Sequence, residues 1–210
     1  MNPDGTPPGD NPDLTSLVYA WGMRNAFGFD FDPSNGRLIA TEAGPSSDDE
    51  INLIVKGGNY GWPTCLGICH DPSFIDPIVD FNPVVTPTGI ATVAPNVYYF
   101  GEYNTGNMVR LELTPTGSVV SMNLTYTQSG GIIAVENGPN GLLYFTSPSA
   151  IYTYQVGVPI PPSTPTPTLL DPLLIIFGTA ATIATAVAVV YGVIRSRSKH
   201  FTPASTRPAL

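Results

Sequence analysis

Residues 48–63 read DDEINLIVKGGNYGWP. The stretch opens with acids, continues through a short apolar run and ends in a dense turn closed by proline. A short apolar run bounded by turn residues is typical of a β-strand, and glycines tolerate the backbone angles of tight turns. Taken alone, the stretch predicts a strand over 51–55 followed by a structural turn. Because acids precede the strand, a calcium-binding element is the second interpretation.

Similar short runs extend through the chain on both sides of this stretch. The other predicted strands are 17–21, 27–31, 37–41, 96–101, 107–113, 118–126, 131–135, 141–146 and 150–156. The turns at 32–37, 114–118 and 137–141 separate neighbouring runs as hairpin turns do. Many short strands without a helical period indicate an all-β sandwich, barrel or propeller. FDPSNGRLIATE and NGPNGLLYFTS both place Pro, Asn and Gly before an apolar strand, and this weak repeat favours a propeller.

The charge balance limits the kinds of partner. The chain carries 8 Lys and Arg against 16 Asp and Glu, a net charge of −8. Four of the basic residues follow position 194, so residues 1–157 are more acidic than the whole chain. Nucleic acid binding requires clustered basic residues, and we therefore predict no nucleic acid partner. An acidic domain is compatible with cation binding.

The C-terminal part contains an apolar segment. Residues 173–194 include no charged residue and no proline. A helix of this length spans ~33 Å, enough to cross a bilayer core of about 30 Å. We predict a transmembrane helix over 172–194, with a buried core helix as the alternative. Basic residues follow the segment, which predicts a cytoplasmic tail over 195–210.

The predicted topology places the N-terminal domain outside the membrane. Residues 1–157 would be extracellular or periplasmic, and the Pro- and Thr-rich residues 158–171 would form an extended stalk. The N-terminus MNPDGTPPGDNPDL has the composition of a loop and does not resemble a signal peptide. Either the apolar segment acts as a reverse signal-anchor or the chain is a fragment, and we favour the fragment.

Two further features fit an extracellular domain. Cys65 and Cys69 lie four residues apart, which favours a small-loop disulfide. Free thiols and a metal site are the alternatives, and His70 is the only additional ligand beside the pair. Asn123 stands in the sequence NLT, an acceptor pattern for N-glycosylation.

Two segments near the opening stretch contain candidate binding residues. Arg24 and Asn25 suit an anionic planar ligand, although a local ion pair and a turn cap explain them equally well. The turn at Gly44 and Pro45 exposes carbonyls shortly before the acids that end at Glu50. Carbonyl and carboxylate oxygens are the ligands of calcium, and a solvated acidic turn is the alternative. The bent turn after the strand could also present the carbonyl of Tyr60.

Three motifs together resemble a known family. WGMRNAFG (21–28), TEAGP (41–45) and DEINLIVKGGNYGWP (49–63) resemble the pyrroloquinoline quinone (PQQ)-dependent soluble glucose/sorbosone, or aldose sugar, dehydrogenases. The strand 107–113 and the stretch GIIAVENGPNGLLY fit the later part of that family. The resemblance covers roughly residues 3–157 and implies about three blades, the C-terminal half of a six-bladed β-propeller. The expected fold is therefore all-β, with one C-terminal transmembrane helix.

The resemblance also implies roles for individual residues. Arg24 and Asn25 would contact PQQ, and the backbone of Gly44 and Pro45 would hold the calcium that touches it. The Glu50 side chain and the Tyr60 carbonyl would belong to a second, structural calcium site. The family's base histidine lies outside this chain, so no catalytic residue is predicted here. His70 and His200 do not occupy its place.

The chain departs from the family pattern at several positions. Met23 stands where histidine commonly precedes the arginine, and Ala43 where histidine or glutamine is common. The family places basic residues near the positions of Asn104 and of 131–133, where this chain has none. A tricarboxylate facing Arg24 alone would be poorly neutralised.

Three functions remain at this point. The first is the C-terminal part of a membrane-anchored PQQ-dependent sugar dehydrogenase-like protein, which oxidises the C1 hydroxyl of aldoses outside the cell and passes electrons to an acceptor. The second is a non-catalytic, calcium-stabilised extracellular propeller that acts as a binding module. The third is a generic adhesion-type β-sandwich, which would leave the matched motifs unexplained.

Overall fold

The computed structural model describes residues 1–157. This part holds eleven β-strands and no helix. In chain order they are β1 (Ala26–Asp32), β2 (Arg37–Glu42), β3 (Asp49–Ile54), β4 (Val79–Phe81), β5 (Pro87–Ala94), β6 (Val97–Glu102), β7 (Asn107–Leu113), β8 (Val119–Thr127), β9 (Ala134–Asn137), β10 (Leu143–Thr146) and β11 (Ile151–Tyr154). Within residues 1–157 no helix is long and apolar enough to cross a membrane. The predicted stalk, membrane span and tail lie outside the described residues.

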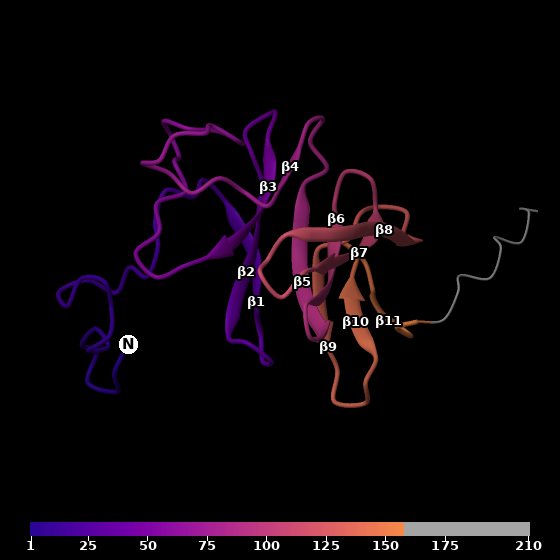
Figure 1. The fold of residues 1–210 in the computed structure, drawn as a ribbon. Helices are drawn as coiled ribbons and strands as arrows, with labels where there is room; N and C mark the ends of the chain where they lie inside the picture. Colours follow the sequence, from indigo (N-terminus) through magenta and orange to yellow (C-terminus); the bar gives the residue numbers. More distant parts are fainter. Residues whose placement is uncertain (158–210) are drawn as a thin grey trace, which may run out of the picture. The chain divides into compact units, whose positions relative to one another are not determined.

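The strands form three antiparallel sheets in chain order. Sheet 1 has the order β1-β2-β3-β4, sheet 2 the order β5-β6-β7-β8, and sheet 3 the order β9-β10-β11. Figure 1 shows the three sheets following one another along the chain, and each sheet is a meander in which consecutive strands are neighbours. This succession of small antiparallel sheets is the architecture of a β-propeller.

Alternating apolar residues explain why the sheets pack on one another. In β7, NMVRLEL, Leu111 and Leu113 are buried, while Arg110 and Glu112 lie half-buried on the opposite face and pair at 2.8 Å. One core lies between sheets 1 and 2, and a second lies between sheets 2 and 3. The first consists of Ile39, Ile51, Ile90, Tyr98, Phe100, Val109, Leu111 and Leu113. The second consists of Ala91, Tyr99, Met108, Ile132, Val135, Leu143 and Phe145.

The first strands of the three sheets run side by side in the same direction. An ideal Cβ on Gly28 of β1 would lie 2.7 Å from the Thr88 carbonyl oxygen of β5. Further along, the Thr92 amide donates to Asp30 Oδ2 at 2.7 Å. Strand β5 approaches β9 in turn, because an ideal Cβ on Gly89 would lie 2.2 Å from the Val135 nitrogen. Glycine at these positions therefore permits the close approach of neighbouring sheets.

Polar contacts join the hairpin of sheet 1 to sheet 2. The buried Asp32 accepts hydrogen bonds from the Asn96 amide at 2.8 Å and from the Tyr98 hydroxyl at 3.1 Å. It also accepts bonds from Ser34 inside its own turn. Burial alone would raise the pKa of Asp32, but these hydrogen bonds outweigh it and lower the pKa to about 2. The carboxylate therefore stays ionised and holds two sheets together.

The structure confirms most predicted strands and corrects others. The turns 32–37, 114–118 and 137–141 connect β1 to β2, β7 to β8 and β9 to β10. The strand predicted at 17–21 is wrong: this segment joins no sheet and forms only an isolated bridge between Trp21 and Asn59. Strands β4 and β5 were missing from the strand prediction.

Candidate functional site

The predicted binding residues gather at one end of the sheets. Strands β1, β5 and β9 run in the same direction, and neighbouring strands within each sheet are antiparallel. The even-numbered strands therefore run the opposite way, and the loops that follow them lie at the end of the sheets where β1 begins. Arg24 and Asn25 precede β1, Gly44 follows β2, and Asn104 follows β6. The loop after β8 brings residues 131–133 to this end as well.

Arg24 binds the backbone of the turn after β2. Its Nη1 donates to the carbonyl oxygens of Ala43 at 2.9 Å and Gly44 at 3.0 Å. Its guanidinium also lies over the ring of Trp62, 5.6 Å from the centroid, in a cation–π arrangement. The Arg24 backbone amide donates to Glu42 Oε1 at 2.5 Å. The structure thus brings Arg24 directly against the Gly44 carbonyl.

The turn at Gly44 is held by a buried aspartate. The Gly44 amide donates to Asp49 Oδ1 at 2.7 Å, and Asp49 Oδ2 accepts from the amides of Val85 and Thr86 at 2.7 and 2.6 Å. An ideal Cβ at position 44 would lie 2.1 Å from the Ser47 carbonyl oxygen, so only glycine fits. Asp49 therefore serves as a structural acceptor that joins two loops.

Glu50 lies in a row of acids across three strands. The register pairs Glu42 of β2 with Glu50 of β3, and Glu50 with Asp80 of β4. Glu50 Oε1 accepts from the Gly67 amide at 2.8 Å, and Glu50 Oε2 accepts from Asn52 Nδ2 at 2.9 Å. We call Glu42, Glu50 and Asp80 the carboxylate row.

Sequence reasoning identified Glu50 but missed its two neighbours in the row. Glu42 and Glu50 flank residues 43–49, which would have placed them opposite one another once a hairpin centred on this segment was assumed. Asp80 carried no such signal, because β4 is short and follows a long loop.

The carboxylate row concentrates acidic groups, and Arg24 offsets their charge at Glu42. Burial, and then the nearby Glu42 and Asp80, raise the pKa of Glu50 to about 7, although bonds from Asn52 and Gly67 act against this. Burial also raises the pKa values of Glu42 and Asp80. Asn52 Oδ1 and Asp80 Oδ1 are buried and accept no hydrogen bond from the described residues.

We expect the stability of the protein to fall between pH 4.5 and about 7 when divalent cations are chelated. The folded-state pKa of Glu50, about 7, exceeds its ordinary value of 4.5, so the folded protein binds the extra proton. This contribution is complete below pH 4.5 and is lost as the pH rises through 7, in total about 3 kcal/mol. Urea unfolding across this range measures it. Glu50→Gln should flatten the dependence, while the exposed Glu136→Gln should retain it.

The residues fit calcium unequally at the two predicted positions. At the carboxylate row, buried oxygens and excess negative charge suit a hard cation. At the turn, the Gly44 carbonyl already accepts a hydrogen bond from the Arg24 guanidinium, and this positive group would compete with a cation there. No group of three or more His, Cys, Asp and Glu residues within 1–157 is arranged to hold a metal ion. Backbone carbonyls would therefore have to complete any calcium site.

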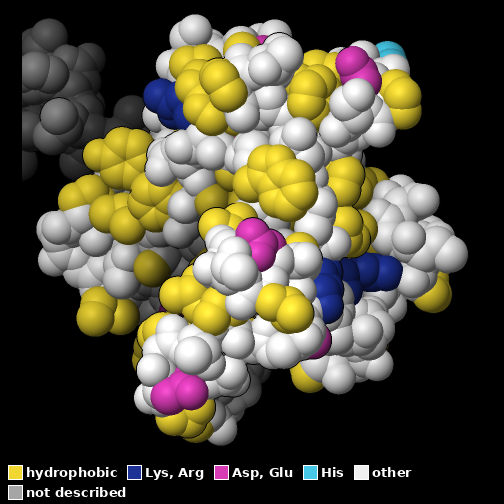
Figure 2. Space-filling view, turned by 90° about the vertical axis from the view of Figure 1, so that its left-hand side faces the viewer, with side chains coloured by type: hydrophobic (Ala, Val, Ile, Leu, Met, Phe, Trp, Pro, Cys, Tyr) yellow, Lys and Arg dark blue, Asp and Glu magenta, His cyan; other side chains and the backbone are white. Residues whose placement is uncertain are grey.

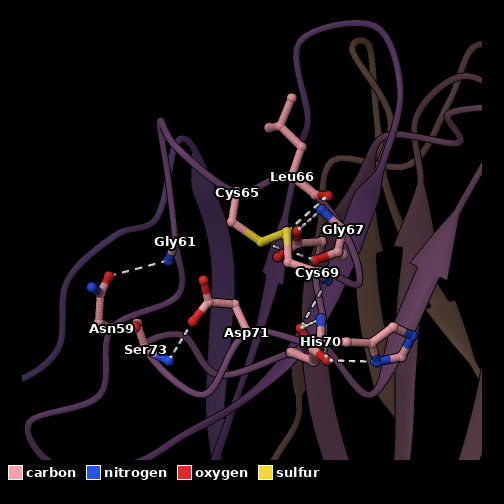
Figure 3. Close-up of a disulfide and its surroundings, with 11 residues drawn as sticks. Asn59, Gly61, Cys65, Leu66, Gly67, Cys69, His70, Asp71 and Ser73 are labelled. Atoms are coloured by element: carbon pink, nitrogen blue, oxygen red, sulfur yellow. Dashed lines mark hydrogen bonds and ion pairs between the residues drawn. A yellow bond between two sulfur atoms is a disulfide. The ribbon is translucent and has the colours of Figure 1, made fainter.

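Tyr60 and the disulfide belong to the long loop between β3 and β4. The buried Tyr60 donates its hydroxyl to the Leu53 carbonyl at 2.7 Å and accepts from the Val55 amide at 2.8 Å, so its side chain fastens the turn. Cys65 and Cys69 form a disulfide with a Cα–Cα distance of 6.1 Å. Figure 3 shows Gly67, which lies between the two cysteines in sequence, beside the disulfide; the Gly67 amide donates to Glu50. The disulfide thus closes the loop that covers the carboxylate row.

The remaining predicted residues lie on the surface. Asn25 and Pro45 are exposed, and Asn123 is exposed on β8, where N-glycosylation stays a prediction. The side chain of His70 is 85% exposed and lies 3.5 Å from Asp76. A hollow of about 580 Å³ lies at the site end, and no charged residue lines it. It is lined by Tyr103, Asn104, Thr105, Gly106, Thr127, Gln128, Ser129, Gly130 and Gly131.

The fold and the site together define an all-β, propeller-like protein with candidate anion- and cation-binding groups at one end of its sheets. Residues 1–151 match the family model of glucose/sorbosone dehydrogenases, and the chain belongs to this family.

Named relatives agree with the family match. Over 77 residues the chain is 52% identical to quinoprotein glucose dehydrogenase B of Acinetobacter calcoaceticus, covering 35% of this chain and 16% of that protein. Among solved structures it is similar to the PQQ-bound aldose sugar dehydrogenase of Streptomyces coelicolor, with 31% identity, a TM-score of 0.63, and coverage of 70% and 44% of the two chains.

A third relative supports the fold. The apo-form aldose sugar dehydrogenase of Escherichia coli is similar with a TM-score of 0.55 at 22% identity, over 66% of this chain and 47% of that one. The chain therefore spans less than half the length of these relatives.

Proposed function

We propose that the chain forms one wall of the cofactor site in a membrane-anchored, PQQ-dependent sugar dehydrogenase-like protein that acts outside the cell. The observation that carries this proposal is the contact of Arg24 with the Gly44 carbonyl, which joins the two predicted cofactor-binding motifs at one end of the sheets. The family membership and the PQQ-bound Streptomyces relative support PQQ as the cofactor.

The chain's own groups would bind and orient the cofactor. Arg24 is exposed and uses only Nη1 for bonds to the described residues, so the rest of its guanidinium can pair with a carboxylate. Asn25 beside it can donate and accept. When bound, PQQ would supply the acceptor for the hydride that leaves C1 of an aldose. The proton of the C1 hydroxyl would pass to a base contributed by the part of the protein that this chain does not span.

The test uses the complete product of the gene, with saturating PQQ and calcium, an aldose and an artificial electron-accepting dye. Aldose-dependent reduction of the dye supports the dehydrogenase. Absence of reduction at saturating cofactor contradicts it and favours the second candidate below. The natural electron acceptor and the particular sugar would follow from screens of the active protein.

The second candidate is a non-catalytic, calcium-stabilised binding module. The observation that favours it is the uncharged lining of the hollow at Asn104 and Gly131, where the family places basic residues. A neutral hollow does little to neutralise an anionic quinone.

Both candidates predict that calcium stabilises the fold through Glu50. Adding calcium to chelator-treated protein at pH 7 should raise the thermal midpoint, because the ion would neutralise the carboxylate row. Glu50→Gln should abolish the rise, since it removes one charge from the row without changing its shape. The exposed Glu136→Gln is the matched control and should leave the rise intact. An equal rise in Glu50→Gln would exclude calcium from this position.

A further inference from the structure

Glu42 contacts the Arg24 segment and the carboxylate row at once. Its side chain is buried at the end of β2. The Arg24 backbone amide donates to Glu42 Oε1 at 2.5 Å, and the Asn25 amide binds the same carboxylate. The other oxygen, Oε2, lies 3.5 Å from Asn52 Nδ2. One carboxylate therefore holds the backbone of the predicted anion-binding residues and belongs to the row.

Asn52 connects Glu42 to Glu50 inside the row. Its Nδ2 donates to Glu50 Oε2 at 2.9 Å and reaches Glu42 Oε2 at 3.5 Å. Asn52 is 0% exposed, and its Oδ1 accepts no hydrogen bond from the described residues. A buried amide oxygen without a donor, beside carboxylates, is a group that a hard cation can satisfy. The row therefore offers a cation one oxygen besides those of its carboxylates.

Arg24 places a positive charge beside this row. Burial raises the pKa of Glu42, whereas the amides of Arg24 and Asn25, and then the charge of Arg24, act against the rise. The other Lys and Arg residues within 1–157 are Arg37, Lys56 and Arg110. Figure 2, a view from the left-hand side of Figure 1, shows Lys and Arg in few places among hydrophobic and uncharged side chains. Glu42 and an anion bound at Arg24 would thus compete for one guanidinium charge.

We propose that the carboxylate row and Arg24 bind a divalent cation and a carboxylate anion cooperatively, with Glu42 as the positioning residue between them. A cation at the row offsets the charge of Glu42 and leaves the Arg24 charge available to the anion. Linkage requires that the anion strengthen cation binding by the same factor. The coupling acts through the row and not through a cation that touches the anion at Gly44. It rests on the proposed function, because it takes the anion at Arg24 to be the cofactor.

The first test measures PQQ binding to the complete product of the gene, with calcium and with a chelator. Calcium should strengthen binding by the wild type about tenfold. Glu42→Gln removes the charge but keeps an oxygen that accepts the Arg24 amide. It should therefore bind PQQ more tightly than the wild type in chelator and lose most of the calcium dependence. The exposed Glu136→Gln is the control and should behave as the wild type. Weaker binding by Glu42→Gln in chelator, or an unchanged calcium dependence, overturns the proposal.

The second test needs no PQQ, so it separates this inference from the proposed cofactor. Calcium affinity is measured from the rise of the thermal midpoint with calcium concentration. Arg24→Ala removes a positive charge beside Glu42, so it should bind calcium severalfold more tightly. Lys56→Ala is the control, because Lys56 follows the opposite end of β3 from Glu50 and should leave the affinity unchanged.

The double variant shows whether Glu42 carries this effect. In Glu42→Gln, adding Arg24→Ala should change calcium affinity much less than it does in the wild type, because the two charges act on each other. An equal effect in both backgrounds would place calcium at the Gly44 carbonyl and overturn the coupling. Equal affinities of the wild type and Arg24→Ala would also overturn it, even if PQQ binds. Tighter calcium binding by Arg24→Ala that depends on Glu42 supports it, even if PQQ does not bind.

Hydrogen exchange tests the positioning itself. The amides of Arg24 and Asn25 should stay protected in Glu42→Gln, whose side chain retains an acceptor, and exchange faster in Glu42→Ala, which has none. Glu136→Ala should leave their exchange unchanged. If these amides exchanged equally in Glu42→Ala and the wild type, Glu42 would not hold the segment, and the proposal would be wrong.

Discussion

Asp32→Ala should lower the free energy of unfolding by at least about 3 kcal/mol. The carboxylate is fully buried and accepts bonds from the Asn96 amide, the Tyr98 hydroxyl and Ser34. Alanine would leave these donors unsatisfied at the junction of sheets 1 and 2. Urea denaturation of the full chain in detergent, followed by intrinsic fluorescence, measures the loss.

The exposed Asp13→Ala is the control for this variant. Asp13 accepts bonds from Thr15 within its own turn and joins no sheets, so its replacement should cost far less stability than that of Asp32. Acid titration adds an independent check. The pKa of Asp32, lowered from 3.8 to about 2, contributes about 2 kcal/mol above pH 3.8, and this part is lost as the pH falls through 2. Equal losses in the two variants would show that Asp32 does not join the sheets.

Gly89→Ala should separate sheet 2 from sheet 3 and cost about 3 kcal/mol. A Cβ at this position would lie 2.2 Å from the Val135 nitrogen and 2.7 Å from Ala134 backbone atoms. Backbone atoms of β9 cannot rotate away as a side chain can, so the strand itself must move. Hydrogen exchange should therefore rise first in β9 and β10, and urea unfolding gives the total loss.

Gly9→Ala is the matched control, because an ideal Cβ at Gly9 meets no atom within 4 Å. It should change stability by less than about 0.5 kcal/mol and leave exchange in β9 unchanged. If Gly89→Ala behaved like Gly9→Ala, the close approach of β5 and β9 would be wrong.

The regular parts of the fold could be predicted from the sequence. Strand β7 was predicted with its observed bounds, 107–113, because its apolar residues alternate with Arg110 and Glu112. The hairpin turns were predictable because Asp, Asn and Gly impose turn geometry locally; Gly36, for example, has φ of +74°. These signals depend on neighbours in sequence alone.

The strand prediction failed where contacts between sheets, rather than local sequence, determine the structure. Strand β5 escaped prediction because it lies between two sheets, and that position selects small residues such as Gly89 and Ala91 over the bulky ones that mark a strand. The segment 17–21 has strand-like composition, but it lies over sheet 1, where Ala20 joins the cluster around Tyr60. Ala20 packs on this cluster, and the other apolar residues of the segment are exposed, so none of them marks a strand of a sheet.

The candidate site was predictable in its parts but not in its contacts. The resemblance located Arg24, Gly44 and Glu50, whereas only the register placed Glu42 and Asp80 beside Glu50. That Arg24 binds the Gly44 carbonyl could not be foreseen either, because it depends on how the segment before β1 crosses the turn after β2. Both features arise from residues far apart in sequence.

The most direct measurement of the central claim is equilibrium binding of PQQ to the complete product of the gene in the presence of calcium, followed by quenching of intrinsic fluorescence. If Arg24 and the turn at Gly44 form one wall of a PQQ site, that protein should bind PQQ. Arg24→Ala should weaken that binding at least about tenfold, while the exposed Lys56→Ala should not. Absence of binding, or equal binding by the wild type and Arg24→Ala, would contradict a cofactor site at this end of the sheets.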